Sequence, residues 1–396
     1  MRRLTHAEFL ALRRFDALDG LRALAALIVV FYHTGGPQSR FLSGWIGVHV
    51  FFVVSGFLIT TLMLREHDRN GRISLRDFYL RRAFRIMPLY YLVLGLSVLS
   101  VYGQRGEWPA MRQHLPHFLL FMNEYHLPPR VAYLHTWTIG IEWKFYLVWP
   151  LLLVAVTAVS RHLRIPLALL VAALALVPYT TTWAGMGVHY AVLLTGALLA
   201  LVLHTRRGFA LLSPLTHPLV ALAVTAGFLV LHAEIPDLVA HFHGDQPPVL
   251  IYGVGVALLL PGLLAPGPGR WLLSRRPLVL IGERSYGLYL VQGLAAALAV
   301  VLVPSLPHPA PLFATVVALL SLAVADLLHT RVESPMIAMG RRLIRKLAGP
   351  APTPAPTPAP TPASGRPGGP GLPDRASVAP ARATSAAEPA KASHSA

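Results

Sequence analysis

The 396-residue chain contains no cysteine, and only 13% of its residues are charged, against about 25% in an ordinary soluble domain. The absence of cysteine excludes disulfides and thiolate metal ligands. Acidic residues are scarce, with 17 Asp and Glu against 34 Lys and Arg, and the formal net charge is +17. Because the arginines flank apolar segments, this charge is typical of cytoplasmic membrane loops, and we expect no nucleic-acid partner.

The chain contains many long apolar segments. Each is close to the roughly 20 residues that a helix needs to cross the hydrocarbon core of a bilayer. They lie near 20–36, 46–64, 86–102, 138–158, 165–183, 186–204, 216–233, 249–265, 285–303 and 311–331. We therefore predict an all-α, polytopic integral membrane bundle of about ten transmembrane helices, with the lipid bilayer as a partner.

Arginines in alternate connections predict the orientation. The connection 65–85 holds seven arginines, and every second connection after it is also basic, whereas the connection after 233 carries acidic residues. The positive-inside rule then places both termini in the cytoplasm. The connection 103–135 fits least well, because it contains three arginines and is long enough for a short extra helix.

Three regions follow from this pattern. Residues 1–15 form a cytoplasmic N-terminal segment, and 16–348 form the membrane domain. Residues 349–396 are rich in Pro, Ala and Thr, so we expect a disordered cytoplasmic tail with polyproline character at its start.

Arg22 and His33 stand eleven residues apart in the first apolar segment. Eleven helical steps of about 100° bring both side chains to one face, roughly 16 Å apart along the axis. Ionisable residues within membrane helices usually face a bundle interior or a wet cavity and are functional candidates. A neutral His33 could take a proton from a hydroxyl. A histidine that is only hydrogen-bonded at a helix end, beside Gly35, explains the spacing equally well.

Ser55 and Gly56 lie within the second apolar segment. Small residues let another helix pack closely. Because no G-x-S-x-G elbow surrounds Ser55, helix packing is favoured over a nucleophilic role.

Arg81, Arg82 and Arg85 precede the third apolar segment. On a helix they are i,i+3 and i,i+4 neighbours, so their forked donors could grip phosphates. A cluster that stops translocation or contacts anionic lipid headgroups is the simpler interpretation of these residues alone.

Glu142 is a carboxylate close to an apolar span and needs a partner. Lys144, two residues away, faces elsewhere on a helix, so a histidine or an arginine from another span is the better candidate. Tyr286 and Tyr289, and later Glu333, place polar groups at the cytoplasmic boundary. The pairs His114/His117 and His241/His243 lack further ligands, so no metal site is expected.

Taken in order, the six features around these residues resemble the acyltransferase 3 family of bacterial multispanning membrane O-acyltransferases. They run from about Phe15 to Pro335. The resemblance implies transfer of an acyl group, often acetyl, from cytoplasmic acyl-CoA to a hydroxyl of a carbohydrate or glycoconjugate, in the bacterial cell membrane. It implies no permanently bound cofactor. Some relatives acylate macrolide-like secondary metabolites instead, and that acceptor stays open.

The resemblance also implies roles for individual residues. Arg22 and His33 match the family's Arg-x10-His pair, with the histidine as base, and Arg82 and Arg85 match its basic pair. Further motif positions fall on Ser55, Glu142, Ser285, Tyr286, Tyr289 and Glu333. Gln292 stands where relatives usually have histidine, so a proton-transfer role is lost there. We expect residues 349–396 to take the place of the esterase-like domain that some relatives carry.

The mechanism that follows is a hypothesis. Arg22, Arg81, Arg82 and Arg85 would hold the coenzyme A phosphates, His33 would deprotonate the acceptor, and Glu142 would orient or charge-stabilise His33. A transporter or flippase would also fit many spans with buried polar residues, although such proteins often show internal repeats, and none is convincing here. A membrane scaffold that docks partners through its proline-rich tail is a third alternative.

Overall fold

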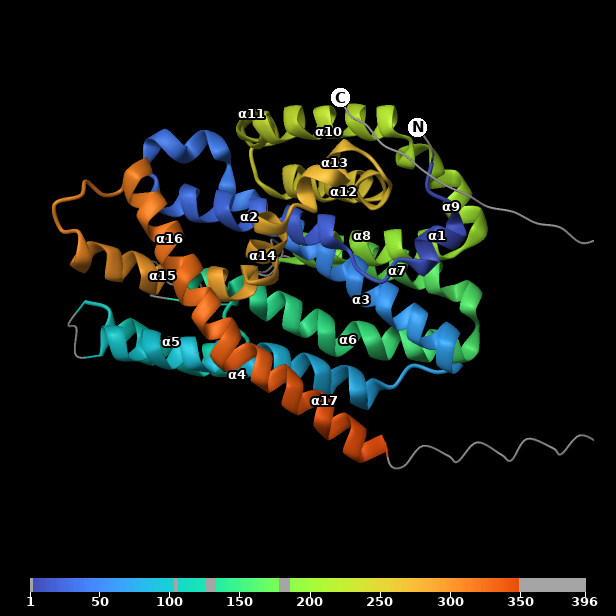
Figure 1. Cartoon of the computed structure of the whole chain (residues 1–396), viewed down its shortest axis with the longest axis horizontal. Helices are drawn as coiled ribbons and strands as arrows, with labels where there is room; N and C mark the ends of the chain where they lie inside the picture. The colour runs from blue at the N-terminus through green and yellow to red at the C-terminus, as the bar shows by residue number, and fades with distance from the viewer. Residues whose placement is uncertain (1–2, 103–105, 126–132, 178–185, 349–396) are drawn as a thin grey trace, which may run out of the picture. The chain divides into compact units, whose positions relative to one another are not determined.

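The computed structural model describes residues 3–102, 106–125, 133–177 and 186–348. These residues form α-helices and contain no strand (Figure 1). The helices are α1 His6–Ala11, α2 Asp16–Thr34, α3 Val48–Asn70, α4 Leu75–Val101, α5 Trp108–Leu119, α6 Trp137–Val159, α7 Arg164–Leu176, α8 Gly187–His204, α9 Arg206–Leu212, α10 Pro218–Ala233, α11 Ile235–His241, α12 Gln246–Leu264, α13 Pro268–Leu273, α14 Arg276–Glu283, α15 Ser285–Leu302, α16 Pro311–Leu328 and α17 Ser334–Ala348. Short 3-10 turns are η1 Pro37–Leu42, η2 Gly44–Gly47, η3 Leu134–Thr136, η4 Arg161–Leu163 and η5 Ser213–Thr216, and η6 His329–Glu333 is a π-helical turn. The predicted tail, 349–396, lies outside the described residues.

The predicted all-α membrane architecture is confirmed. Among the described residues, eight helices are long and apolar enough to cross a membrane, or nine if the pair Arg206–Thr216 and Pro218–Ala233, bent by 76°, counts as one span. Each of the ten predicted apolar segments coincides with a helix. Two of these helices are short, namely α7 with 13 residues and α10 with 16. The predicted span 165–183 also runs into residues outside the described ranges. The number ten and the cytoplasmic termini therefore stay predictions.

Large apolar side chains on the outside of the bundle agree with lipid contact. In a soluble protein, exposed apolar residues are scattered singly, whereas here they follow whole helices. On α10, for example, Leu219, Leu222, Leu229 and Val230 are each about 60% exposed. The chain is a multi-pass membrane protein.

One predicted boundary is wrong. Residues 65–85 were expected to form a connection, but α3 continues to Asn70 and α4 begins at Leu75. Gly71 ends α3 in the left-handed region, with φ 69°, and Ser74 caps α4 by accepting a hydrogen bond from the Asp77 amide. Hydropathy marks only the part of a helix inside the hydrocarbon layer, so it missed these polar helix ends. The basic cluster consequently lies on a helix.

The connection 103–135, by contrast, contains the short extra helix that its length allowed, α5.

Close backbone contacts hold α3 against α8. A Cβ added at Gly56 of α3 would lie 2.0 Å from the Leu193 carbonyl oxygen, and one added at Gly196 of α8 would lie 2.0 Å from the Val53 oxygen. Small residues let membrane helices approach in this way, so the predicted packing role of the Ser55–Gly56 segment is confirmed at Gly56.

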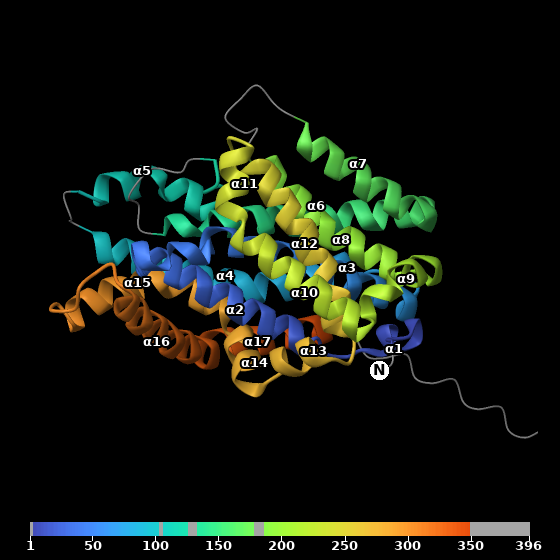
Figure 2. The ribbon, with the colours of Figure 1, turned by 90° about the horizontal axis from the view of Figure 1, so that it is seen from above.

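Further helices surround this pair. In Figure 2, α8 lies beside α3, and α7 lies beyond α8. On the opposite side of the bundle, α16 lies beside α2. Both figures place α10 against α12, and Figure 1 shows α17 crossing α4. The centre between α2, α3, α4, α6 and α15 contains the polar residues described next.

Candidate active site

A cavity of about 220 Å³ lies among α2, α3, α4, α6 and α15. Most of its polar lining comes from residues that the sequence motifs contain. The charged and hydroxyl-bearing residues at the cavity are Asp19, Arg22, Ser55, Arg82, Arg85, Thr138, Glu142, Tyr146, Ser285, Tyr286 and Tyr289. Five helices far apart in the sequence therefore bring residues of five of the six motifs to one place, and the closing motif around Glu333 is not among them.

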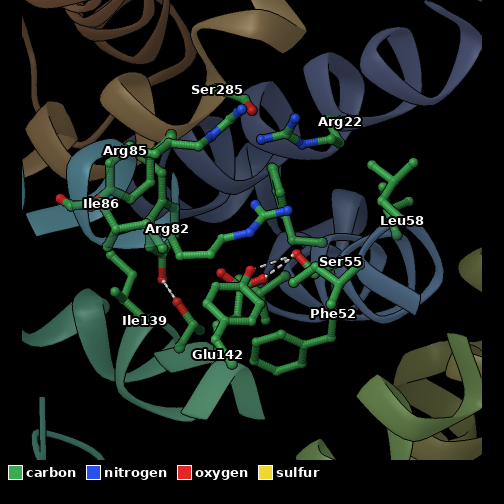
Figure 3. Close-up of a pocket in the computed structure, with 18 of the residues that line it drawn as sticks. Arg22, Phe52, Ser55, Leu58, Arg82, Arg85, Ile86, Ile139, Glu142 and Ser285 are labelled. Carbon is green, nitrogen blue, oxygen red and sulfur yellow. Dashed lines mark hydrogen bonds between the residues drawn. The ribbon is translucent and has the colours of Figure 1, made fainter. Parts of the chain in front are cut away.

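Three arginines converge in this cavity. Figure 3 shows the guanidinium groups of Arg22, Arg82 and Arg85 pointing toward one another across it, with Ser285 beside Arg85. Arg22 forms an ion pair of 3.4 Å with Asp19, one helical turn earlier. Against these three cations stand two carboxylates at the cavity, so its charge is positive.

Glu142 is the second carboxylate. Its Oε1 accepts a hydrogen bond of 2.7 Å from the Ser55 hydroxyl, and the Tyr146 hydroxyl lies 3.1 Å from the same serine oxygen. The charge of Glu142 also acts on Arg22 and Arg82. Arg22 and Arg82 therefore stay the candidate partners of Glu142, whose hydrogen bonds in the described structure go to no histidine.

Lys144 turns away from this cavity, as predicted. Its ammonium group lies 2.5 Å from Oε1 of Glu124, whose side chain is fully buried.

The Arg81 side chain lies outside the central cavity, unlike those of the other three arginines. It forms an ion pair of 2.9 Å with Glu66 and faces a second hollow of about 210 Å³ between α3, α4 and α17. Arg341 of α17 also lines this hollow, which shares Leu62, Arg82 and Arg85 with the central cavity. The hollow and the cavity therefore form one continuous basic region.

His33 lies elsewhere. It is in the last turn of α2, is exposed, and does not line the central cavity. His33 is close enough to His135 for electrostatic interaction between the two side chains. Nε2 of His135 is 3.2 Å from the Leu290 carbonyl oxygen. Tyr289 links the two places, because it lines the cavity and its hydroxyl donates to the His135 carbonyl.

The remaining motif residues have structural partners. Tyr286 lines the cavity and donates to the Ile86 carbonyl at 2.9 Å. Glu333 is buried and lies 3.0 Å from Nδ1 of His329, away from the cavity lining. Gln292 donates to the Tyr289 carbonyl at 3.2 Å, while its buried Oε1 has no hydrogen-bond partner among the described residues.

The sequence did not single out Asp19, Tyr146 or Arg341 as site residues. Asp19 and Tyr146 stand three and four residues from Arg22 and Glu142, so helical spacing could have identified them. Arg341 could not have been found in this way, because only the fold brings α17 to α4.

The chain was also compared with known protein families. The acyltransferase 3 family, whose model is described as an acyltransferase domain, matches residues 15–330. The chain belongs to this family. The matched region contains every predicted site residue except Glu333, and Arg341 also lies beyond it.

Several relatives of this chain are named as O-acetyltransferases. A putative peptidoglycan O-acetyltransferase, YrhL, from Bacillus subtilis is 31% identical over 315 residues, covering 70% of this chain and 48% of the relative. The peptidoglycan O-acetyltransferase OatA of Listeria monocytogenes is 30% identical, with 69% and 48% covered. The O-acetyltransferase OatA of Staphylococcus aureus is 28% identical, with 70% and 50% covered. The chain thus spans about half the length of these relatives. No solved structure matches the chain.

Proposed function

We propose that this protein transfers an acyl group, most simply acetyl, from acyl-CoA to a hydroxyl of a carbohydrate or glycoconjugate in the bacterial cytoplasmic membrane. The convergence of Arg22, Arg82 and Arg85 in one cavity carries the proposal. Such a cluster suits a phosphate-bearing donor, because guanidinium groups bind phosphate oxygens through paired hydrogen bonds. The names of the relatives support acetyl transfer to a carbohydrate.

The donor end of the site is the basic region. Arg82 and Arg85 line both the central cavity and the α17 hollow, so they can bind phosphates that enter beside Arg341. Glu142 keeps Arg22 and Arg82 in place as a counter-charge, held by Ser55 and Tyr146. This role replaces the orientation of His33 that the sequence suggested for Glu142.

The acceptor end lies at His33. Eleven residues along α2 separate His33 from Arg22, or roughly 16 Å. An extended thioester arm running along α2 would bring its acyl group toward His33 and His135. This arrangement gives the two substrates separate ends of one helix.

The reaction follows acyl-transfer chemistry. The acceptor oxygen attacks the thioester carbonyl while His33 takes the hydroxyl proton, and the carbon–sulfur bond breaks. The thiolate of coenzyme A leaves and takes a proton, and the product is an ester. Well-placed base catalysis contributes about 10²–10⁴-fold.

The experiment is an assay of the purified chain with radiolabelled acetyl-CoA and a panel of acceptors, namely peptidoglycan fragments, oligosaccharides and a macrolide. We expect label transfer to a carbohydrate hydroxyl. His33→Ala should lower the rate by at least 10²-fold while the protein still accumulates in the membrane. His241→Ala is the matched control, because His241 is exposed on α11 and lines no cavity described above.

Three results would count against the proposal. Wild-type rates in His33→Ala would remove the histidine from the reaction. Transfer to the macrolide alone would replace the carbohydrate acceptor. No coenzyme A release with any acceptor would favour the transporter or scaffold alternatives.

A further inference from the structure

A second polar cleft lies away from the candidate active site. It is a hollow of about 630 Å³ at the ends of α3 and α8 and the start of α7, within the roughly 300–1,000 Å³ range of small-molecule sites. Eight of its twelve lining residues are polar or charged, and it shares no residue with the central cavity. We call it the Arg164 cleft, and its polar lining residues are His67, Asp68, Arg161, His162, Arg164, His204, Thr205 and Arg206.

Arg164 is the central feature of this cleft. It is 9% exposed, and its Nε donates to the Thr157 hydroxyl at 2.8 Å. Its buried Nη2 has no hydrogen-bond partner among the described residues. Burial lowers the pKa of the Arg164 guanidinium, because the charged form loses hydration. A buried cation with a free donor is costly unless an anion pairs with it.

The surrounding charges do not supply that anion in full. Arg161 and Arg206 add two more cations, whereas Asp68 is the only carboxylate among the described lining residues, and its charge acts on Arg164. Asp68 already lies 2.7 Å from Nε2 of His204. The cleft therefore keeps a net positive charge even if every histidine is neutral.

The first turn of α7 adds a second source of donors. The helix begins at Arg164, directly after the 3-10 turn η4, and no side-chain hydrogen bond caps it. Pro166 has no N–H, so only the Arg164 and Ile165 amides of this turn can contribute. Amide groups in such a turn favour a negative charge. Arg164 and Ile165 of this turn both line the cleft.

We propose that the Arg164 cleft binds the phosphate group of an anionic ligand. Arg164 and Arg161 supply forked donors, and Arg206 closes the binding site from the start of α9. On the predicted topology the cleft faces the cytoplasm at the membrane boundary. The phosphate can therefore belong to an acidic phospholipid headgroup or to a soluble phosphate compound. This site is independent of the acyl-transfer proposal.

The test uses the full chain purified in a neutral detergent. Native mass spectrometry with phosphatidylglycerol, and with phosphatidylcholine for comparison, measures headgroup binding, and thermal unfolding with inorganic phosphate measures the soluble source. We expect the wild type to bind one of the two probes saturably. Arg164→Ala should weaken this binding about tenfold or more, because the loss of one hydrogen bond to a charged group lowers affinity by about this factor. Retention of phosphatidylglycerol alone would identify a lipid, and a response to inorganic phosphate would identify a soluble ligand.

The control and a second variant keep the test decisive. Arg207→Gln removes the same charge from an exposed position next to Arg206 but outside the cleft lining, so it should bind like the wild type. If Arg164→Ala does not fold, Arg161→Gln combined with Arg206→Gln changes only exposed side chains and should show the same loss. Equal binding by that double variant and Arg207→Gln, or no binding of either probe by the wild type, would overturn the proposal.

Discussion

At the scale of single residues, the candidate site sets three guanidinium groups against two carboxylates. Asp19 pairs with Arg22, and Glu142 is held by hydrogen bonds from α3 and α6. One unit of positive charge is therefore left for a ligand inside a cavity between five helices. In such surroundings a charge-assisted hydrogen bond is stronger than at an open surface.

Arg82 provides the sharpest residue test. Because it lines both the cavity and the α17 hollow, Arg82→Ala should raise the KM for acetyl-CoA about tenfold or more, with a smaller change in kcat. Initial rates at varied acetyl-CoA measure both constants. Arg72→Ala is the control, because Arg72 is exposed and lines neither hollow. An unchanged KM in Arg82→Ala would remove Arg82 from donor binding.

Arg341 extends the donor site beyond the region that the family model matches. Arg341→Ala should raise the KM for acetyl-CoA in the same direction but less than Arg82→Ala, since Arg341 lines only the α17 hollow. Arg342→Ala removes the neighbouring charge, which is exposed and does not line that hollow, and should have no effect in the same assay. Equal effects of the two variants would show that only the overall charge of α17 matters.

At the scale of helices, the glycine contacts set how closely α3 packs against α8. Gly56→Ala would place a methyl group 2.0 Å from the Leu193 oxygen, so α3 and α8 must separate, at a cost of about 1–3 kcal/mol. Thermal unfolding in detergent measures the loss. Gly95→Ala on α4 adds the same methyl group into open space and should be neutral or slightly stabilising. Equal stability of both variants would mean that the contact is not rigid.

The helices themselves were largely predictable, because membrane spans are long apolar runs. Prediction failed where helices continue in polar sequence, as at α4, which begins at Leu75 rather than near 86. It also could not show that Ser55 and Gly56, adjacent in sequence, face a cavity and a neighbouring helix respectively. A step of about 100° per residue separates the two faces, but which face meets which partner depends on the fold.

At the scale of the whole molecule, the site combines motifs that helical spacing alone could not bring together. Spacing placed Arg22 and His33 on one face and Arg82 beside Arg85. It could not indicate that Arg81 turns to Glu66, or that Glu142 binds Ser55, 87 residues away. Such contacts depend on how helices cross, which hydropathy does not encode.

The orientation in the membrane is a further prediction at this scale. Since the chain has no cysteine, Arg72→Cys and His241→Cys each create a unique label site. With the basic connections inside, a membrane-impermeant maleimide should label position 241 in intact cells and position 72 only after permeabilisation. The reverse pattern would invert the topology.

The backbone contact between α3 and α8 has a mechanical consequence. Because the two backbones leave no room for a Cβ at Gly56 or Gly196, α3 and α8 form a rigid pair. Ser55 belongs to this pair. On the other side, α4 meets α17 through the Phe84 ring, whose Cβ lies 2.9 Å from the place of a Cβ on Gly340. Arg82 and Arg85 belong to α4, which meets α17 through this side chain rather than through backbone. A change in the width of the cavity would therefore displace Arg82 and Arg85 rather than Ser55.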